Sequence, residues 1–318
     1  MTTLKVINPH ISKSISKNRK QHVSHAISIM SPIVLAFSLL NYMPANWLPS
    51  LLALLLTAIF FTLGSAGLAL GLHRYFTHHA FKTSAAGEIL LSLLGTWSLQ
   101  GSIVSWVSDH RRHHRFADQQ YDPHSPYAND QGLINNRIAG LFHAHIGWKF
   151  TSAVSEENRY VPELLKNPIV MFFSRHYFIV AISGLLAPGL IGWFFGGLEE
   201  AINCLFWAGC VRAVLIHQLA WAVSSFGHMF GEKIEGALDE SRNNVFLGMI
   251  LLGEGLHSYH HQYPTLAMNE PAKFDAFGHS LVFFERFGLV WDLRKAKPVP
   301  VVTTAQPQQT ALQGAGTI

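Results

Sequence analysis

Long runs without charged side chains dominate the pattern of hydrophobic and polar positions along the chain. No Asp, Glu, Lys or Arg occurs between Lys20 and Arg74, and about 20 apolar residues suffice to cross a bilayer. The prolines and asparagines of NYMPANWLP at 41–49 interrupt this run, as turn-forming residues do. The pattern therefore predicts two membrane-spanning helices, near 26–43 and near 48–71.

A second pair of spans is expected near 168–188 and 201–221, on either side of a glycine-rich turn at 189–200. This turn holds no Lys or Arg, and the break between the first two spans holds no charge at all. Basic residues instead gather in the N-terminus, in 72–167 and in the C-terminal segment. The positive-inside rule then places both turns outside the cell and the three basic segments in the cytoplasm.

A further uncharged run, at 89–108, is also long enough to cross the bilayer. If it crossed, the histidines before and after it would lie on opposite sides of the membrane. We therefore interpret this run as a re-entrant or buried element that packs against the four spans. The resulting fold class is an all-α integral membrane protein, with four transmembrane helices in two hairpins and a cytoplasmic helical cap.

Composition supports a membrane protein and suggests where its main domain begins and ends. Of the 318 residues, 49% are hydrophobic and only 13% are charged, whereas about 25% are charged in soluble domains. Residues 1–25 are basic and polar, and we expect a cytoplasmic tail there and no secretory signal peptide. The main domain is expected over 26–297, and the polar segment 298–318 is expected to be disordered. Cys204 and Cys210 are interpreted as buried thiols, not as a disulfide.

Histidine is as abundant as Asp and Glu together, with 19 residues, and three groups of histidines lie beside expected membrane elements. The motif H-x-x-H-H occurs at 110–114 and again at 257–261. Its spacings of three and four residues place three imidazoles on one helix face. In HRYFTHH at 73–79, His73 and His78 are five residues apart, which is roughly 140° around an ideal helix. They converge only if the helix bends or ends between them.

These clusters predict a site for two metal ions, because neutral imidazole is a preferred ligand for Fe, Cu, Zn and Ni and eight or nine imidazoles exceed what one ion takes. A lone histidine, His228 in GHMF, follows the fourth span, and taken by itself it reads as a core histidine. Nucleic-acid binding by DHRRHHR at 109–115 is disfavoured, since such binding wants a basic face with exposed aromatic residues. Here Asp109 and Asp118 flank the arginines at a membrane surface.

The motifs HRYFTH, HRRHH, GHMFG and HSYHH resemble, in this order, those of the membrane fatty acid desaturases, specifically the Δ9 acyl-CoA desaturase type. HRRHHRFADQQYDPH at 110–124 and GEGLHSYHHQYP at 253–264 are especially similar to that family, and the resemblance covers roughly 60–295. It implies a di-iron centre that cycles between Fe²⁺ and Fe³⁺, with O₂ as co-substrate. The implied product is a cis double bond in a saturated acyl chain. The motif positions carried over as iron ligands are His73, His78, His110, His113, His114, His228, His257, His260 and His261.

Two departures from the family pattern affect the surroundings of this centre. Ser224 stands four residues before the lone His228, where relatives often carry an asparagine associated with a metal-bound water, and we expect the serine to hold that water. Ser108 and TSAV at 151–154 stand where the animal enzymes carry basic residues that contact coenzyme A. The acyl carrier is therefore left open among CoA, an acyl carrier protein and a membrane lipid.

The electron donor implied by the resemblance is a separate protein, such as a ferredoxin or a cytochrome b5-type protein, because no fused cytochrome b5 domain is expected. The acyl chain needs a bent tunnel that excludes water. Trp97, Gln100, Trp106 and Trp221 are the candidates to line it, and the last three match family positions near the bend. Trp97 equally fits an interfacial or core aromatic residue.

Acidic side chains are expected to orient the metal-binding imidazoles through hydrogen bonds. Asp109 adjoins His110 in the sequence, and Glu254 lies three residues before His257. Either carboxylate could equally belong to a local salt bridge. Glu254 is the better candidate, because it repeats the GEG of the family.

Other functions stay open at this point. A hydroxylase of the alkane or carotenoid type, or an acetylenase, would share the iron and the topology and differ in its product. A metal transporter or sensor is more remote, because transporters place ionisable residues along a mid-membrane pathway. Zinc has no redox chemistry, and unactivated methylene groups need a redox metal with oxygen, which favours iron.

Overall fold

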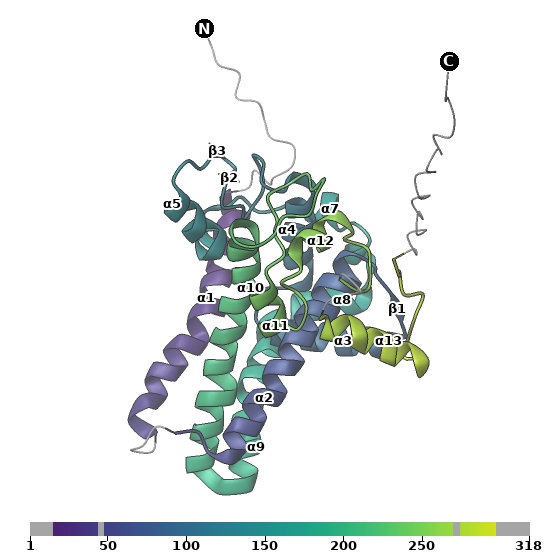
Figure 1. Ribbon diagram of the computed structural model, residues 1–318. Helices are drawn as coiled ribbons and strands as arrows, with labels where there is room; N and C mark the ends of the chain where they lie inside the picture. The colour runs from purple at the N-terminus through teal and green to yellow at the C-terminus, as the bar shows by residue number, and fades with distance from the viewer. Residues whose placement is uncertain (1–14, 44–47, 270–273, 297–318) are drawn as a thin grey trace, which may run out of the picture.

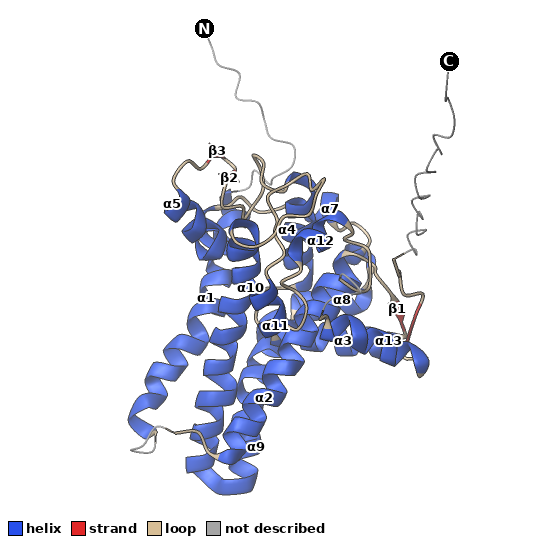
Figure 2. Ribbon diagram, in the orientation of Figure 1, coloured by secondary structure: helices blue, strands red, loops and turns tan. Residues whose placement is uncertain are grey.

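The computed structural model describes residues 15–43, 48–269 and 274–296, and this part of the chain is mostly helical, with loops between the shorter helices (Figure 2). Four two-residue strands form two small antiparallel sheets. Residues 1–14 of the expected N-terminal tail, and the whole of the expected C-terminal tail at 298–318, lie outside the described residues.

Long helices form a bundle that extends away from a group of shorter helices (Figure 1). These long helices are α1 (Ile15–Leu39), α2 (Leu51–Ala66), the π-helix η2 (Gly67–Thr77) that continues α2, α9 (Tyr177–Cys204), the π-helix η5 (Leu205–Val211) and α10 (Arg212–Met229). A 3₁₀ turn, η1 (Leu40–Tyr42), ends the first of them. Three stretches of the described chain are long and apolar enough to cross a membrane: Arg19–Tyr42, Leu51–Thr77 and Tyr177–Met229.

The third of these stretches folds back on itself near its middle. Gly196 and Gly197 have non-helical angles, and Gly197 has a φ of 68°, a conformation that glycine adopts without steric cost. Figure 1 shows α9 and α10 lying side by side on either side of this reversal. A Cβ atom at Gly192 would overlap Cys204 and the backbone of Glu200. The glycines therefore permit both the turn and the close contact of its two legs.

This reversal is much tighter than the glycine-rich turn expected at 189–200, because the helix continues up to Gly196. The start of the stretch also differs from the expected helix at 168–188. A separate short helix, α8 (Pro168–Arg175), begins with the Asn167 side chain accepting hydrogen bonds from two backbone N–H groups. It ends at His176, whose angles are non-helical. The break at His176 therefore divides the apolar run at 168–188 into α8 and the beginning of α9.

The uncharged run at 89–108 is likewise divided, into α3 (Ala85–Trp97) and α4 (Ile103–Phe116). Leu99 and Gly101 both have positive φ values between the two helices. Ser102 then caps α4 by accepting a hydrogen bond from the Ser105 backbone N–H, as serine commonly does at a helix start. The break turns α4, which carries the second histidine motif, onto a new axis.

The helix α1 begins at Ile15, inside the segment 1–25 that was expected to form a tail. Its first turns contact the short helices: the His22 Nε2 atom lies 3.0 Å from the Ser152 carbonyl oxygen, and the His25 Nδ1 atom lies 3.1 Å from the Lys149 carbonyl oxygen. These tertiary contacts explain why a polar, basic segment is helical.

The shorter elements gather at one end and along one side of the bundle (Figure 1). They are β1 (Lys82–Thr83), β2 (Ala128–Asn129), β3 (Gly132–Leu133), α5 (Arg137–Phe142), η3 (His143–Gly147), α6 (Trp148–Thr151), α7 (Glu157–Tyr160), η4 (Leu164–Lys166), α11 (Val245–Ile250), α12 (His257–Gln262), α13 (Ala276–Arg286) and β4 (Val290–Trp291). Cys204 and Cys210 are buried free thiols, as expected.

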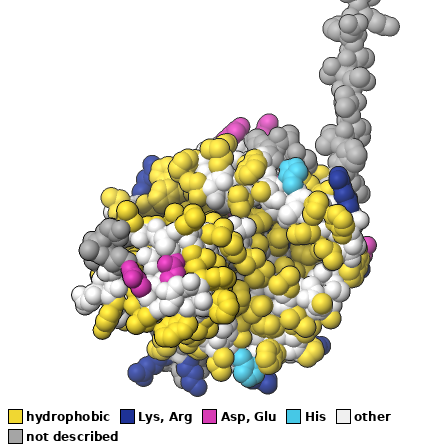
Figure 3. Space-filling view, turned by 90° about the horizontal axis from the view of Figure 1, so that it is seen from below, with side chains coloured by type: hydrophobic (Ala, Val, Ile, Leu, Met, Phe, Trp, Pro, Cys, Tyr) yellow, Lys and Arg dark blue, Asp and Glu magenta, His cyan; other side chains and the backbone are white. Residues whose placement is uncertain are grey.

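Apolar side chains cover the outside of the bundle as well as its interior. Leu51 of α2 is 84% exposed and Phe194 of α9 is 82% exposed. Viewed along the bundle from the end opposite the short helices, the surface is mostly hydrophobic and the visible Lys and Arg side chains lie near its edge (Figure 3). Exposed apolar surface on this scale is typical of a protein that contacts lipid or a partner.

Candidate metal centre

All nine histidines that the motifs single out lie in two neighbouring groups, each of which could hold a metal ion. Within each group the ligand nitrogens lie within 4.8 Å of one another. The first group is His73, His78, His110, His114 and His260, and the second is His113, His228, His257 and His261. The nine side chains come from η2 and its C-terminal cap, α4, α10 and α12.

The pair His73 and His78 is brought together by the π-helix η2. A π-helix forms hydrogen bonds between residues five apart, and the His78 N–H donates to the His73 carbonyl at 3.2 Å. Their ring centroids are 4.9 Å apart. An α-helix would have placed the two rings on different sides of the helix. The wider turn of the π-helix places them on the same side. Such π segments are frequent at functional sites.

Each H-x-x-H-H motif supplies both groups instead of pointing all three rings at one place. In α4, His110 and His114 belong to the first group and His113 belongs to the second. In α12 the division is reversed, with His257 and His261 in the second group and only His260 in the first. The two motifs therefore lie across the boundary between the groups and hold them next to each other.

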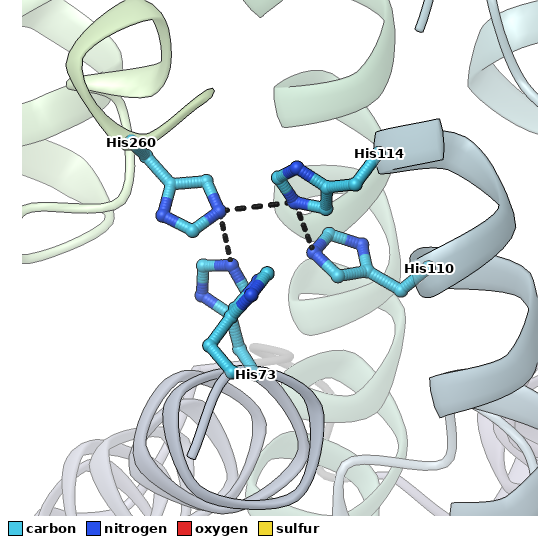
Figure 4. A group of neighbouring side chains, drawn as sticks. His73, His110, His114 and His260 are labelled. Atoms are coloured by element: carbon cyan, nitrogen blue, oxygen red, sulfur yellow. Dashed lines mark hydrogen bonds between the residues drawn. The ribbon is translucent and has the colours of Figure 1, made fainter. Parts of the chain in front are cut away.

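Four rings of the first group converge on one point (Figure 4). The Nε2 atom of His260 lies 2.9 Å from that of His73 and 3.1 Å from that of His114, and the Nε2 atoms of His114 and His110 are 3.1 Å apart. The rings come from three different elements and meet through the same type of nitrogen. This convergence is what a common cation would require.

The second group shows why a cation fits better than hydrogen bonds between the rings. The Nδ1 atom of His113 lies 2.9 Å from Asp122, and the Nδ1 atom of His261 lies 2.6 Å from Asp239. Each Nδ1 therefore carries the proton and donates it to a carboxylate, which leaves a lone pair on Nε2. These two Nε2 atoms face each other at 3.2 Å. Two lone pairs repel at this distance unless a positive ion lies between them.

Carboxylates orient two further rings in the same way. The His73 Nδ1 donates to Glu254 at 2.8 Å and the His228 Nδ1 donates to Asp118 at 2.8 Å. Hydrogen bonds of this type fix the tautomer and the direction of metal-binding imidazoles. Glu254 was expected to orient a histidine and lies three residues before His257 in the sequence. It stands in the turn before α12 and contacts His73.

Arg74 joins the contact between His73 and Glu254 to a buried network of charged side chains. Its Nη2 atom donates to Glu254 at 2.6 Å and to Asp275 at 3.0 Å. Burial opposes ionisation of Glu254, but the charges of Arg74 and His73 outweigh it and lower the pKa of Glu254 to about 2. Glu254 is therefore a carboxylate at neutral pH and holds both His73 and Arg74.

The charge state of the rings suits metal binding. Burial, followed by the charges of neighbouring histidines, holds the pKa of His78, His110 and His114 well below 6.5. The same two causes act on His257 and His260. Such rings are neutral at physiological pH and offer a lone pair, which is the form that metals bind.

Three orienting carboxylates, Asp118, Asp122 and Asp239, were not singled out in the sequence. Asp118 and Asp122 follow the second motif within RFADQQYDP, and their spacing to the histidines gives a weak signal for a contact. Asp239 lies in a loop before α11 and gives no signal at all. Asp109, which was singled out, does not contact His110: its carboxylate accepts a hydrogen bond from Ser155 at 2.7 Å. Asp109 also lines the cavity beside the histidine groups.

His124 is a further residue that the motifs did not assign to the site. Its ring lies 4.1 Å from that of His113, centroid to centroid, and it forms a third possible metal-holding group with His113 and Asp122. Because His113 already belongs to the second group, we place His124 beside the centre. Its side chain forms part of the wall of the adjacent cavity.

A cavity opens directly onto both histidine groups. His73, His110, His113 and His257 line it, together with the tunnel candidates Gln100, Trp106 and Trp221 and with Ser224, the candidate for holding a water. Apolar side chains of η2 and α10 form much of the remaining wall, namely Leu68, Ala69, Ile216, Leu219, Ala220 and Val223. The arrangement suits a long apolar ligand whose middle passes the histidines.

Trp97 does not line this cavity, in contrast to the expectation. Its ring stacks on Phe60 with centroids 5.7 Å apart, and its Nε1 atom donates to Ser183 at 3.1 Å. A Cβ atom at Gly184 would overlap the Trp97 ring. Trp97 therefore ends α3 against α2 and α9 and has the structural role that was its alternative.

Comparison with known proteins agrees with this site. A family model described as fatty acid desaturase matches residues 45–274. The chain is 36% identical over 236 residues to the hex-5-enoyl-[acyl-carrier protein] acetylenase of Moorena producens, covering 73% of this chain and 74% of that protein. It is 31% identical over 231 residues to the sn-1 stearoyl-lipid 9-desaturase of Anabaena variabilis, covering 71% and 76%. It is 31% identical over 219 residues to human stearoyl-CoA desaturase 5, covering 67% of this chain and 63% of the human protein.

Proposed function

The chain belongs to the fatty acid desaturase family, as its histidine motifs indicated, and we propose that it introduces a cis, Δ9-like double bond into a saturated acyl chain with O₂ as co-substrate. Both the family membership and the geometry of the cavity support this proposal. The family consists of oxidoreductases that act on acyl chains, and the cavity brings an apolar ligand to both histidine groups. The contact between that cavity and the two groups is the observation that carries the proposal.

We propose that each histidine group holds one iron ion. The facing lone pairs of His113 and His261 support this assignment, as does the all-imidazole donor set. A pair of redox-active iron ions would supply the oxidising chemistry that unactivated methylene groups require. Ser224 lines the cavity one helical turn before His228, which fits the expectation that it holds a water beside the centre.

The residues of the chain itself bind the substrate, direct it and exclude water. Apolar side chains of η2 and α10 line the cavity and would replace water around the acyl chain. Trp106 stacks on the ring of His110, with centroids 4.8 Å apart. This contact fixes one wall of the cavity at the first histidine group, where the reacting carbon atoms would lie.

The membrane arrangement that we propose has four spans in two hairpins, formed by α1, by α2 with η2, and by the two legs on either side of Gly197. The apolar outer surface and the reversal at Gly197 support it. The positive-inside rule then places the histidine groups and the short helices in the cytoplasm. A separate ferredoxin or cytochrome b5-type protein would deliver electrons from that side.

An acetylenase is the second candidate, because the relative from Moorena producens carries that name at 36% identity. An acetylenase would act on a chain that already holds a double bond. CoA, an acyl carrier protein and a membrane lipid all occur as carriers in the names of the relatives, so the carrier stays open here. Analysis of the products separates these possibilities from each other and from hydroxylation.

The test is expression of the chain in a host whose acyl chains are saturated, followed by gas chromatography and mass spectrometry of total acyl chains. New cis double bonds should appear with the parent protein and disappear with His113→Ala. His176→Ala is the matched control, because His176 lies at the junction of α8 and α9 and binds only the Phe172 carbonyl. Hydroxylated or triple-bonded products would replace the proposal with one of its alternatives.

A further inference from the structure

The wall of the cavity contains buried N–H donors that have no acceptor. The Gln100 Nε2, Trp148 Nε1 and Trp221 Nε1 atoms are buried, and none has a hydrogen-bond partner among the described residues. All three residues line the cavity that opens onto the histidine groups. Buried donors are nearly always satisfied in native structures. Three unsatisfied donors around one space indicate a ligand that brings an acceptor oxygen.

Lys149 adds a positive charge to the same region. The residue is only 3% exposed, although buried lysines are rare unless they are paired. Its Nζ atom lies 4.0 Å from the Trp148 ring centroid and 3.5 Å from the Gln100 carbonyl oxygen. The charge of the Asp109 carboxylate acts on this ammonium group, but Asp109 accepts its hydrogen bond from Ser155. Two of its three N–H donors are left for a ligand.

Lys149 lines two smaller cavities that share wall residues with the main cavity. One is lined by Lys149, Gln100, Trp221 and His25, and the other by Lys149, Trp148 and Asp109 among others. Gln100, Trp148, Trp221 and Asp109 also line the main cavity. The cation therefore lies behind the wall that carries the unpaired donors, whereas the walls of the main cavity along η2 and α10 are largely apolar.

We propose that Lys149 binds the carbonyl oxygen at the head of the acyl chain and so sets how far the reacting carbon atoms lie from that head. The inference rests on the proposed function and adds to it a positioning residue. A carbonyl oxygen accepts hydrogen bonds and donates none, which matches the three unpaired N–H donors and the ammonium group of Lys149. The backbone of Lys149 is fixed by His25, whose Nδ1 atom lies 3.1 Å from the Lys149 carbonyl oxygen.

Three substrate sources present this same oxygen: a thioester, a glycerolipid ester and a free carboxylate. The shared feature is the carbonyl group, and the surface does not depend on the carrier that follows it. A carboxylate would gain most from the positive charge, since hydrogen bonds between ionised partners are roughly twice as strong as neutral ones.

The experiment compares two ligands that differ only in this oxygen. S-hexadecanoyl-pantetheine is a thioester, and S-hexadecyl-pantetheine is the thioether without the carbonyl. Their dissociation constants are measured on the purified full-length protein in nanodiscs by competition with a fluorescent acyl probe. The parent protein should bind the thioester about tenfold more tightly than the thioether, as expected for a hydrogen bond from a charged donor.

The Lys149→Met variant should lose most of this preference and keep its affinity for the thioether. Methionine occupies a similar volume without the charge, so the variant is expected to fold. The matched control is Lys82→Met, which removes a lysine whose side chain is 67% exposed and should leave the preference at tenfold. Hexadecanoate and 1-hexadecanoyl-lysophosphatidylcholine, tested in the same way, show which source of the carbonyl depends most on Lys149.

An unchanged preference in Lys149→Met would overturn the inference, as would a parent protein that binds the two ligands equally or binds neither. These outcomes are distinct from failure of the proposed function, because double-bond formation is measured separately in the expression host. A parent protein that forms double bonds while Lys149→Met keeps the full preference refutes only the role of Lys149. A shifted double-bond position in Lys149→Met would support the positioning role further.

Discussion

The Nε2 atoms of His113 and His261 face each other at 3.2 Å while both Nδ1 atoms are bound to carboxylates. The two residues are far apart in the sequence and belong to α4 and α12. The carboxylates Asp122 and Asp239 turn two neutral rings so that their lone pairs point at one position. This relationship makes the affinity for a metal depend on residues that never touch the metal.

Asp239→Asn should therefore lower the affinity for iron by about 10- to 100-fold, the usual effect of removing a carboxylate behind a metal-binding histidine. The amide still accepts a hydrogen bond, so His261 keeps its direction and loses only the negative charge behind it. The measurement is the iron content of purified protein after dialysis against a graded series of chelator concentrations. Asp292→Asn is the control, because Asp292 is an exposed carboxylate paired with Lys82. Equal iron retention in both variants would contradict the role given to Asp239.

Glu254→Gln should destabilise the metal-free protein by about 3 kcal/mol, the lower part of the range for removing one partner of a buried ion pair. Arg74 is buried and shares its charge between Glu254 and Asp275, so the neutral variant leaves part of that charge uncompensated. The free energy of unfolding is measured by denaturant titration in detergent, with chelator present so that metal loss does not contribute.

Glu285→Gln provides the comparison for this second prediction. Glu285 pairs with Lys295 at 2.6 Å, and the lysine side chain is 55% exposed. Exposed pairs of this kind contribute about 0–1 kcal/mol, so the control should unfold close to the parent. A Glu254→Gln variant as stable as Glu285→Gln would show that the buried chain of charges does not stabilise the fold.

Gly67→Ala should reduce the yield of folded protein severely, because a Cβ at this position would overlap the backbone of Leu94. The absence of a side chain lets η2 and α3 approach closely. Overpacking typically costs about 1–3 kcal/mol, and a clash with backbone atoms is expected at or above the upper end. The readout is the monodisperse fraction in fluorescence-detected size-exclusion chromatography.

Gly248→Ala is the matched substitution for this third prediction, since Gly248 is also helical and a Cβ there meets no atom within 4 Å. Replacing glycine by alanine in a helix gains up to about 1 kcal/mol. The control should therefore fold as well as the parent. Similar yields of the two variants would mean that η2 and α3 separate without cost.

Spacing along the chain singled out the two H-x-x-H-H motifs, because ligands three and four residues apart share a helix face whatever the rest of the fold does. His228 was added only through the resemblance to the desaturase family. It could not show how the motifs divide between two groups, which depends on the angle at which α4 and α12 meet. It also could not find Asp239, whose loop carries no periodic pattern. Trp97 was misplaced for a related reason: periodicity gives a helix, and only packing decides which of its faces meets the cavity.

Boundaries between helices were the weakest part of the expectation from sequence. The apolar runs at 89–108 and 168–188 each contain a break, at Leu99 to Gly101 and at His176. Hydropathy averages over such breaks because the residues on either side remain apolar. The π-helix η2 was anticipated only as a need for a bend between His73 and His78. Winding of this kind depends on tertiary contacts, including the close approach of α3 at Gly67.

The preference for a carbonyl-bearing ligand should depend on pH through Lys149. Burial lowers the pKa of Lys149 from 10.5 to about 8, and the negative charge of Asp109 opposes part of this shift. The ammonium form therefore predominates below pH 8, and the preference for thioester over thioether should be largest near pH 7. It should decline as the pH rises through 8 and be mostly lost by about pH 9.5.

The groups around Lys149 decide whether this pH dependence can be assigned to it. Asp109 on α4 acts on Lys149 through its charge, His25 on α1 contacts the Lys149 backbone carbonyl, and the charge of Lys149 acts in turn on His124 and His217. Burial raises the pKa of the Asp109 carboxyl and holds the pKa of His124 well below its usual range. The pKa of Lys149, at about 8, lies inside the tested range. Dissociation constants of the two pantetheine ligands at five values from pH 6.5 to 10 test this. In Lys149→Met the ratio should be small and flat with pH, and a ratio that still fell between pH 8 and 9.5 would assign the titration to another group.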